Sequence, residues 1–364
     1  MMKLHKEPLI RIAKRDSITT PKAYGIRILS VLLALAVSGL FIFLVTSLDP
    51  VRVYQAMYNG AFGTSRRSWV TIRDAMMLLI IGVALAPAFK MKFWNIGAEG
   101  QILVGALMTA GFMKAFGGSI PTPALLVLMA VVSLLAGACW GAIPAAFKAY
   151  WNTNETLFTL MMNYVAIQIT SYAVALWENP IGSNTVGVLN QQTKDGWFPP
   201  IFDQAYGLNV IIVMTLAIAM FAYLKYSKQG YEITVVGDSE NTARYAGINV
   251  KIVTIRTMAI SGALCGLAGF IAVAGASHSI STSTAGGKGF TAIIVAWLAK
   301  FNTFVMILIA FLLIFLEKGS VQIASQFNLN DYASSIITGI ILFFILGSEF
   351  FINYRVILRN AKEA

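Results

Sequence analysis

The stretch KFWNIGAEGQILVGAL, residues 92–107, places an Asn, a Glu and a Gln at the start of an otherwise apolar segment. A carboxylate beside an apolar span is costly unless the protein satisfies it. Lys90 and Lys92 precede the stretch, and positive side chains mark the membrane surface. We therefore expect Glu99 to lie at a helix N-terminus near that surface, where the helix dipole and the free N–H groups favour a carboxylate.

The rest of the chain has the composition of a membrane protein. Of its 364 residues, 57% are apolar and only 12% are charged, about half the charged fraction of a soluble domain. Apolar segments long enough to cross a bilayer recur along it. The apolar windows predict ten membrane segments, at residues 26–48, 74–89, 98–116, 122–147, 155–177, 207–226, 255–276, 289–300, 303–318 and 333–352.

The predicted fold is an all-α, polytopic integral membrane protein with about ten transmembrane helices. The eighth and ninth segments are short, which is typical of helices that enter the membrane and break. The first segment is too long for a signal peptide, so we expect an uncleaved first helix. The predicted organisation is a basic N-terminal segment (1–25), a transmembrane domain (26–352) and a C-terminal tail (353–364).

The distribution of Lys and Arg predicts the orientation. With a cytoplasmic N-terminus, 19 of the 27 basic residues fall on the inner side and 8 on the outer side, so both termini are expected to be cytoplasmic. The net charge of +11 is then a topology signal, and it requires no nucleic-acid partner.

Two loops are long enough to carry function. The outer loop 178–206 is rich in Asn, Gly, Pro and Gln and is expected to be irregular and docked on the surface. In the inner loop 228–251, start and stop signals predict a two-turn helix over about 239–246, either a connector or a docking element. Its residues of interest are Gly237, Asp238, Ser239, Glu240, Asn241, Arg244, Tyr245 and Gly247.

The sequence argues against an enzyme. It has no Walker A motif, and its two histidines, His5 and His278, are too few for a histidine-based metal centre or triad. Cys139 and Cys265 are predicted to be small core residues. We expect no catalytic residue, no metal site and no cofactor on this chain.

A few neutral polar side chains fall inside the apolar segments. Asn95, Gln101, Asn163 and Gln168 offer hydrogen-bonding groups in or beside the spans. With few unpaired charges near them, they favour a path for a neutral polar solute such as a nucleoside or a sugar.

Four motifs carry a resemblance that covers nearly the whole chain. They are GAFGT (60–64), FWNIGAEGQILVGA (93–106), NETLFTLMMNYVA (154–166) and GYEITVVGDSENTARYAGIN (230–249). In order and spacing they resemble the permease subunits of bacterial ABC importers of the ribose and branched-chain amino acid class, most of all the nucleoside-uptake branch.

The resemblance implies a multi-pass permease of the bacterial cell membrane that works with several partners. These are a second related permease, a cytoplasmic ATPase with two nucleotide-binding domains that holds ATP and Mg, and an extracytoplasmic substrate-binding lipoprotein. It also implies that the segment from Gly237 to Gly247 is the coupling helix. The chain departs from the branch at Gly289–Phe301, where the branch tends to show GFDGIAVALLG. Here Thr291 replaces the Asp, and Trp297 lies in the apolar stretch. With Glu99, these two residues are further candidates for the path.

Two further hypotheses remain at this stage. The solute is a simple sugar such as ribose or galactose, or the chain is a self-sufficient secondary transporter. The Gly-interrupted starts of the third and eighth segments, which would run in opposite directions, have the outline of an inverted repeat, and both importers and carriers can have one.

Overall fold

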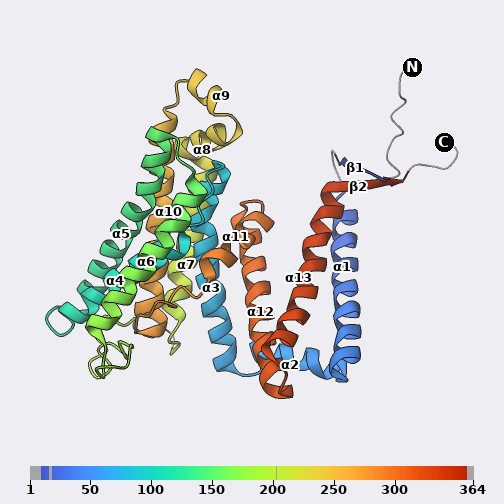
Figure 1. The fold of residues 1–364 in the computed structure, drawn as a ribbon, viewed down its shortest axis with the longest axis horizontal. Helices are drawn as coiled ribbons and strands as arrows, with labels where there is room; N and C mark the ends of the chain where they lie inside the picture. Colours follow the sequence, from blue (N-terminus) through green and yellow to red (C-terminus); the bar gives the residue numbers. More distant parts are fainter. Residues whose placement is uncertain (1–9, 16–18, 202, 359–364) are drawn as a thin grey trace. The chain divides into compact units, whose positions relative to one another are not determined.

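A computed structural model describes residues 10–15, 19–201 and 203–358 of the chain (Figure 1). Its described part is mainly helical, which confirms the predicted all-α membrane class. Each of the ten predicted segments coincides with a helix: α1 (Thr20–Phe41) continued by the π-helix η1 (Ile42–Thr46), α3 (Ser65–Lys90), α4 (Ala98–Phe116), α5 (Thr122–Trp151), α6 (Glu155–Trp177), α7 (Gly207–Tyr226), α10 (Val250–Ala272) continued by the π-helix η2 (Val273–Ser277), α11 (Lys288–Leu298), α12 (Thr303–Phe327) and α13 (Asp331–Asn353).

Eight of these helices are long and apolar enough to cross a membrane, and α4 and α11 are not among them. The 11 residues of α11 span about 16 Å, roughly half of a hydrocarbon core. The expectation of a short eighth segment is therefore confirmed. The expectation of a short ninth segment is wrong, because α12 continues for 25 residues.

Three helices and two strands lie outside the predicted segments. The helices are α2 (Pro50–Phe62), α8 (Lys228–Asp238) and α9 (Glu240–Tyr245); they carry too many polar residues to register as apolar windows. The strands β1 (Ile10–Lys14) and β2 (Tyr354–Leu358) pair antiparallel, with Ile10 opposite Leu358. This ribbon joins two segments that the sequence analysis treated as separate tails.

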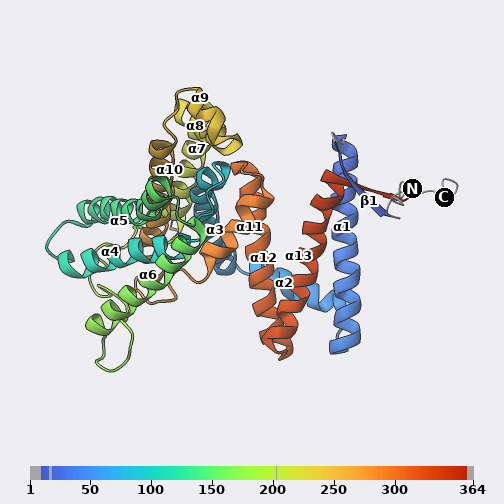
Figure 2. The same ribbon diagram turned by 45° about the horizontal axis from the view of Figure 1, so that its top comes forward.

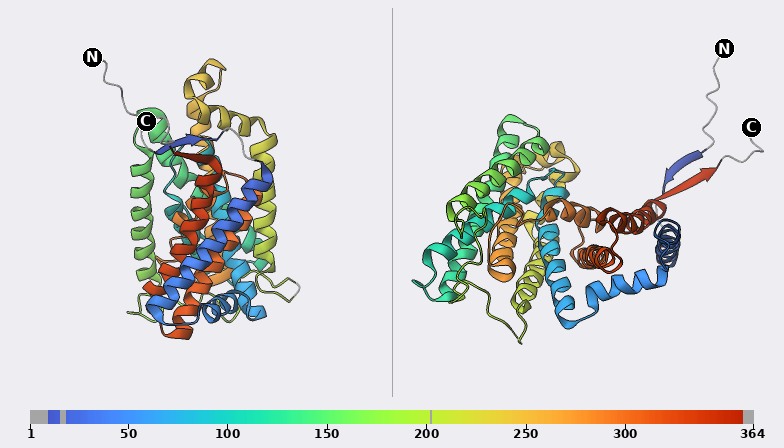
Figure 3. Two further views of the ribbon diagram at one scale, coloured as in Figure 1. Left: turned by 90° about the vertical axis from the view of Figure 1, so that its right-hand side faces the viewer. Right: turned by 60° about the horizontal axis from the view of Figure 1, so that its bottom comes forward.

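The chain forms two compact units, and the first combines its two ends. It comprises residues 1–67 and 315–364. Helices α1 and α13 pack along each other in this unit, as Figure 3 shows. Large apolar side chains on α1 and on η1, such as Ile28, Leu32 and Leu44, stay exposed, which is the pattern of a helix that faces lipid.

The second unit, residues 68–314, is held together by close helix contacts at glycines. Helix α10 packs against both α4 and α5. A Cβ on Gly262 would overlap the carbonyl of Gly137, and one on Gly266 would overlap the carbonyl of Ser133. Small residues spaced by four, such as Gly262 and Gly266, allow helix backbones in a membrane to approach this closely.

The outer loop 178–206 is irregular and docked, as predicted. Phe198 is buried, and its N–H donates to the carbonyl of Ala274 over 3.0 Å. The ring of Trp197 stacks on His278 with centroids 3.7 Å apart. Aromatic contacts therefore fix the middle of this loop to the outer end of α10 and η2.

One prediction about the core is wrong. Cys265 is buried as expected, but Cys139 is exposed. The residue lies within α5, whose apolar membrane-facing side cannot be told from its buried side by hydropathy alone.

Replacing Gly262 by Ala should destabilise the second unit. The added methyl group meets backbone rather than a movable side chain, and overpacking of this kind costs about 1–3 kcal/mol. Thermal unfolding in detergent measures the effect. Gly339→Ala is the matched control, because nothing lies within 4 Å of a Cβ at that position on α13, so its unfolding temperature should not fall.

The docked outer loop should loosen in acid. Partial burial lowers the pKa of His278, so the unfolded state binds a proton at a higher pH than the folded state does. This contribution to stability is complete above the unfolded pKa of about 6.5 and is lost as the pH falls through the folded pKa. Between pH 7.5 and pH 5, the unfolding temperature of the wild type should therefore drop further than that of His278→Gln; equal drops would contradict the assignment.

Candidate functional site

Glu99 joins the first turns of two helices. It is the second residue of α4 and is 8% exposed. One carboxylate oxygen accepts a hydrogen bond from the backbone N–H of Gly287 over 2.7 Å, and the other accepts from Gly289 over 2.9 Å. These glycines flank Lys288, where α11 begins. Glu99 thus caps the N-terminus of a helix distant in sequence.

This geometry corrects part of the expectation for Glu99. The residue does lie at a helix N-terminus, but the N–H groups that it satisfies belong to α11. The 11 residues of α11 separate this contact from the C-terminal end of α11 by about 16 Å. Glu99 is therefore a buried residue at the junction of α4 and α11.

Most of the predicted polar path residues are buried and satisfied by the protein. Asn95 and Gln101 exchange two hydrogen bonds of 3.3 Å, and the amide of Asn95 also donates to Ser261 on α10. Asn163 accepts from the N–H of Gly100 and donates to the carbonyl of Ile96. In this conformation the three side chains hold residues 93–97 and the start of α4 in place.

Trp297 and Thr291 occupy different sides of α11. The indole of Trp297 stacks on Trp94 with centroids 5.4 Å apart and planes 23° apart, and both rings are nearly half exposed. The Thr291 hydroxyl donates to the carbonyl of Gly287 over 3.3 Å. Trp94 was not singled out from the sequence, although it stands next to Asn95 in the stretch 92–107.

Helix α6 carries an unusual exposed face. Tyr164, Gln168 and Tyr172 follow at intervals of four residues, so they share one side of the helix. All three are exposed, whereas Asn163 and Thr170 on the other side are buried. An amide and two hydroxyl groups in the middle of a membrane helix indicate a face that meets water or protein rather than lipid.

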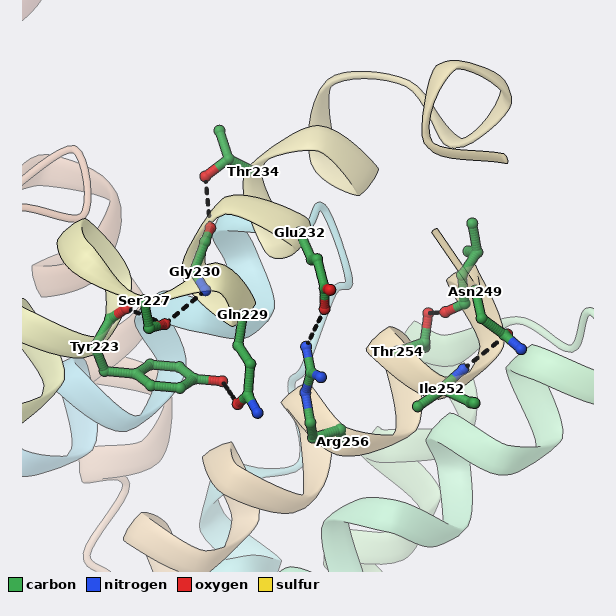
Figure 4. Close-up of polar contacts among 11 residues, drawn as sticks. Tyr223, Ser227, Gln229, Gly230, Glu232, Thr234, Asn249, Ile252, Thr254 and Arg256 are labelled. Atoms are coloured by element: carbon green, nitrogen blue, oxygen red, sulfur yellow. Dashed lines mark hydrogen bonds and ion pairs between the residues drawn. The ribbon is translucent and has the colours of Figure 1, made fainter. Parts of the chain in front are cut away.

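The segment around α8 is fixed to the membrane helices by side-chain bonds (Figure 4). Ser227 accepts from the N–H of Gly230 and so caps α8. Glu232 on α8 forms a 2.9 Å ion pair with Arg256 on α10. A Cβ on Gly237 would overlap the carbonyl of Lys90, which shows how closely α8 packs on the end of α3.

Helix α9 begins and ends on the predicted signals. Ser239 accepts from the N–H of Thr242, and Glu240 pairs with Arg244 over 3.0 Å. After Arg244 the chain makes a Schellman turn, in which Gly247 has φ +77° and the N–H of Ile248 bonds to the carbonyl of Ala243. The helix is one residue shorter at each end than predicted.

Little of α9 is covered by the rest of the unit. Ala243 is buried, but Tyr245 is 93% exposed and the Glu240–Arg244 pair is more than half exposed. Figure 2 shows α8 and α9 together at one end of the second unit. Beside them, a cavity of about 710 Å³ is lined by Lys148, Arg244 and Lys251 among others. Helix α8 is thus fixed to the membrane helices, and α9 projects from it.

Replacing Glu99 by Gln should cost about 1–3 kcal/mol, because one of the two accepting oxygens becomes an NH2 group, which can only donate, and one buried N–H loses its acceptor. The unfolding temperature in detergent measures this loss. Glu178→Gln is a matched control, since Glu178 also accepts two backbone N–H bonds, from Gly182 and Asn184, but in the exposed outer loop. An equal effect of both variants would refute a special role for the buried carboxylate.

Comparison with known proteins gives the chain its family. Residues 70–346 match the family model described as branched-chain amino acid transport system / permease component. The chain is 32% identical to a glucose ABC transporter permease of Haloferax volcanii over 95% of its length and 93% of that protein. It is 30% identical to a guanosine ABC transporter permease of Bacillus subtilis, over 88% of this chain and 92% of that one.

A nucleoside ABC transporter permease of Lactococcus lactis is 25% identical over 84% of this chain and 86% of that one. No solved structure matches. The match covers most of the chain, from α3 to α13, and includes Glu99 and α9. The chain therefore belongs to the branched-chain amino acid transport system permease family, and it is a multi-pass membrane permease subunit of an ABC importer.

Proposed function

We propose that this permease imports a nucleoside and that α9 couples it to a cytoplasmic ATPase. Half of the translocation path would come from this chain and half from a second, related permease. ATP and Mg would be bound and ATP hydrolysed on the separate ATPase, and an extracytoplasmic lipoprotein would deliver the solute. The chain itself would carry out no covalent chemistry.

The observation that carries the coupling proposal is the projection of α9 from a braced base. A helix can transmit a rigid-body motion only if it is exposed to the partner and fixed to the body that moves. The exposed Tyr245 meets the first condition, and the Glu232–Arg256 ion pair and the packing of Gly237 on α3 meet the second. In the resulting alternating-access cycle, closure of the ATPase would move α9 and with it the inner end of the unit.

The nucleoside proposal is supported by aromatic and neutral polar groups on exposed faces. Trp94 and Trp297 present nearly half of their rings, and planar bases stack on such rings without a fixed hydrogen-bonding pattern. Tyr164, Gln168 and Tyr172 add hydrogen-bonding groups on α6. These residues, with Thr291 at the start of α11, are the path residues we propose.

The relatives favour the same class of solute. Those named for guanosine, glucose, riboflavin and ribose share a neutral solute with neighbouring hydroxyl groups. A simple sugar such as ribose or galactose is therefore the second candidate for this chain. A sugar would make less use of a stacked indole pair than a base would.

The second permease is supported by a pair of relatives in one organism. Two guanosine ABC transporter permeases of Bacillus subtilis match the chain, at 30% and 26% identity. This pair is consistent with two related but different permeases in one importer.

Substitutions on the exposed face of α9 test the coupling proposal. Arg244→Glu and Tyr245→Ala should each reduce co-purification of the ATPase at least about tenfold, a loss of roughly 1.4 kcal/mol, because both side chains lie on the exposed face. Tyr226→Ala is the matched control: Tyr226 is also an exposed tyrosine at the inner end, but it lies on α7. Unchanged association in all three variants, with normal membrane insertion, would rule out α9 as the docking element.

Uptake in proteoliposomes tests the class of transporter and its solute. Vesicles containing both permeases, the ATPase and the lipoprotein should accumulate labelled uridine or guanosine only with internal ATP. Labelled ribose and galactose in the same assay separate the two candidate solutes. Uptake by this chain alone, driven by an ion gradient, would show instead a self-sufficient secondary transporter.

A further inference from the structure

The second unit contains a polar cavity at its outer end, and the residues that line it lie outside the four motifs and outside α9. Its volume is about 310 Å³, and its wall comes from α3, from the end of α10 with η2, and from the loop that leads into α11. This is at the lower end of the volumes of small-molecule sites, about 300–1,000 Å³. The cavity therefore fits a small solute or one part of a larger one.

Three charged side chains meet in this cavity. Arg73 bonds to an oxygen of Asp74 over 2.9 Å and also donates to the hydroxyl of Tyr206 over 3.2 Å. The Asp74 side chain is only 6% exposed, whereas that of Lys288 is 27% exposed. The carboxylate is thus fixed and largely desolvated, and Arg73 is occupied on two sides.

Lys288 lies near the Arg73–Asp74 pair but does not form a hydrogen bond with Asp74. Its amine is 3.9 Å from Asp74, which is too long for a hydrogen bond. The position of the backbone at Lys288 is set from elsewhere, because Glu99 binds the N–H groups of Gly287 and Gly289 on either side of it. An ammonium group so placed can donate to a ligand in the cavity.

The remaining polar wall consists of hydroxyl groups. Ser281 bonds to Ser283 over 3.1 Å, and the backbone N–H of Ser281 donates to the hydroxyl of Thr284 over 2.9 Å. Ser277 and Ser279 also line the cavity. A hydroxyl can accept one bond while it donates another, so this wall offers both donors and acceptors to a ligand.

We propose that this cavity binds a pair of neighbouring hydroxyl groups on a neutral solute, with Asp74 accepting from the pair and Lys288 donating to it. The ligand is the ribose of a nucleoside or the ring of a sugar, so the proposal rests on the proposed function and names the part of the solute that this chain holds. The competing occupant is a small anion, because Arg73 and Lys288 together outweigh the charge of Asp74, and inorganic phosphate in the test below distinguishes the two. The cavity would then be an outer station of the path, distinct from the stacked indoles.

Protection of an introduced cysteine tests the site directly. In a Cys139→Ala background, which leaves only the buried Cys265, Ser283→Cys places a thiol on the cavity wall. A membrane-impermeant maleimide should label it in outward-facing membrane vesicles that contain the whole importer. Thr282→Cys is the matched control, since Thr282 is also exposed but does not line the cavity.

Uridine should protect Ser283→Cys and not Thr282→Cys. At a concentration about tenfold above the half-maximal value, labelling should fall about tenfold. Ribose should protect as well, whereas 2′,3′-dideoxyuridine should fail, because a site built for hydroxyl groups rejects an analogue that lacks them. Asp74→Asn and Lys288→Met should raise the half-maximal concentration of uridine at least about tenfold while labelling without ligand is unchanged, and Lys288→Arg should restore part of the protection.

Three results would overturn the proposal. They are protection by dideoxyuridine equal to that by uridine, protection by inorganic phosphate instead, and no protection by uridine or ribose. ATP-driven uridine uptake is measured with the same wild-type importer. Uptake without protection would remove this site but leave the proposed function intact, and protection without ATP-dependent uptake would do the reverse.

Discussion

The arrangement of the second unit depends on one carboxylate between two helix ends. Helices α4 and α11 begin next to each other inside the unit, so the positive ends of two helix dipoles meet where little water can screen them. Glu99 brings a negative charge to that point and accepts one N–H from each side of Lys288. Gly289 must lack a side chain there, since a Cβ would lie 2.7 Å from the Glu99 carboxylate. Two short helices can therefore start in the interior of the protein without a free backbone end.

The sequence predicted the helices well because hydropathy and length dominate in a bilayer. It also predicted α9, whose capping residues act through local bonds. It did not predict the conformation of residues 93–97, because these residues bond to Asn163 and Ser261 on helices far along the chain. For the same reason the sequence did not predict that Asn95 and Gln101 bond to each other. The cluster of Arg73, Asp74 and Lys288 was missed because Lys288 lies more than 200 residues from the other two in sequence.

The inner end of the second unit combines rigidity with exposure. An ion pair joins α8 to α10, and α9 lies between these two helices in the chain. Because Glu232 and Arg256 are mostly buried, their attraction is less screened by salt than that of the exposed Glu240–Arg244 pair on α9. The two pairs therefore have different roles. The Glu232–Arg256 pair fixes α8 to α10, and the Glu240–Arg244 pair lies on the exposed surface of α9.

Helix α11 runs from the outer cavity to the Trp94–Trp297 pair. Its first residue, Lys288, lies in the outer cavity, and Trp297, near its last turn, stacks on the segment that leads into α4. A helix of 11 residues behaves as a rigid rod of about 16 Å, so its two ends cannot move independently. A displacement of the α11 backbone at Lys288 must therefore shift the Trp94–Trp297 contact or stretch the bonds from Gly287 and Gly289 to Glu99. Because those bonds are short and buried, the backbone that borders the outer cavity, the indole pair and the start of α4 are held together as one rigid element.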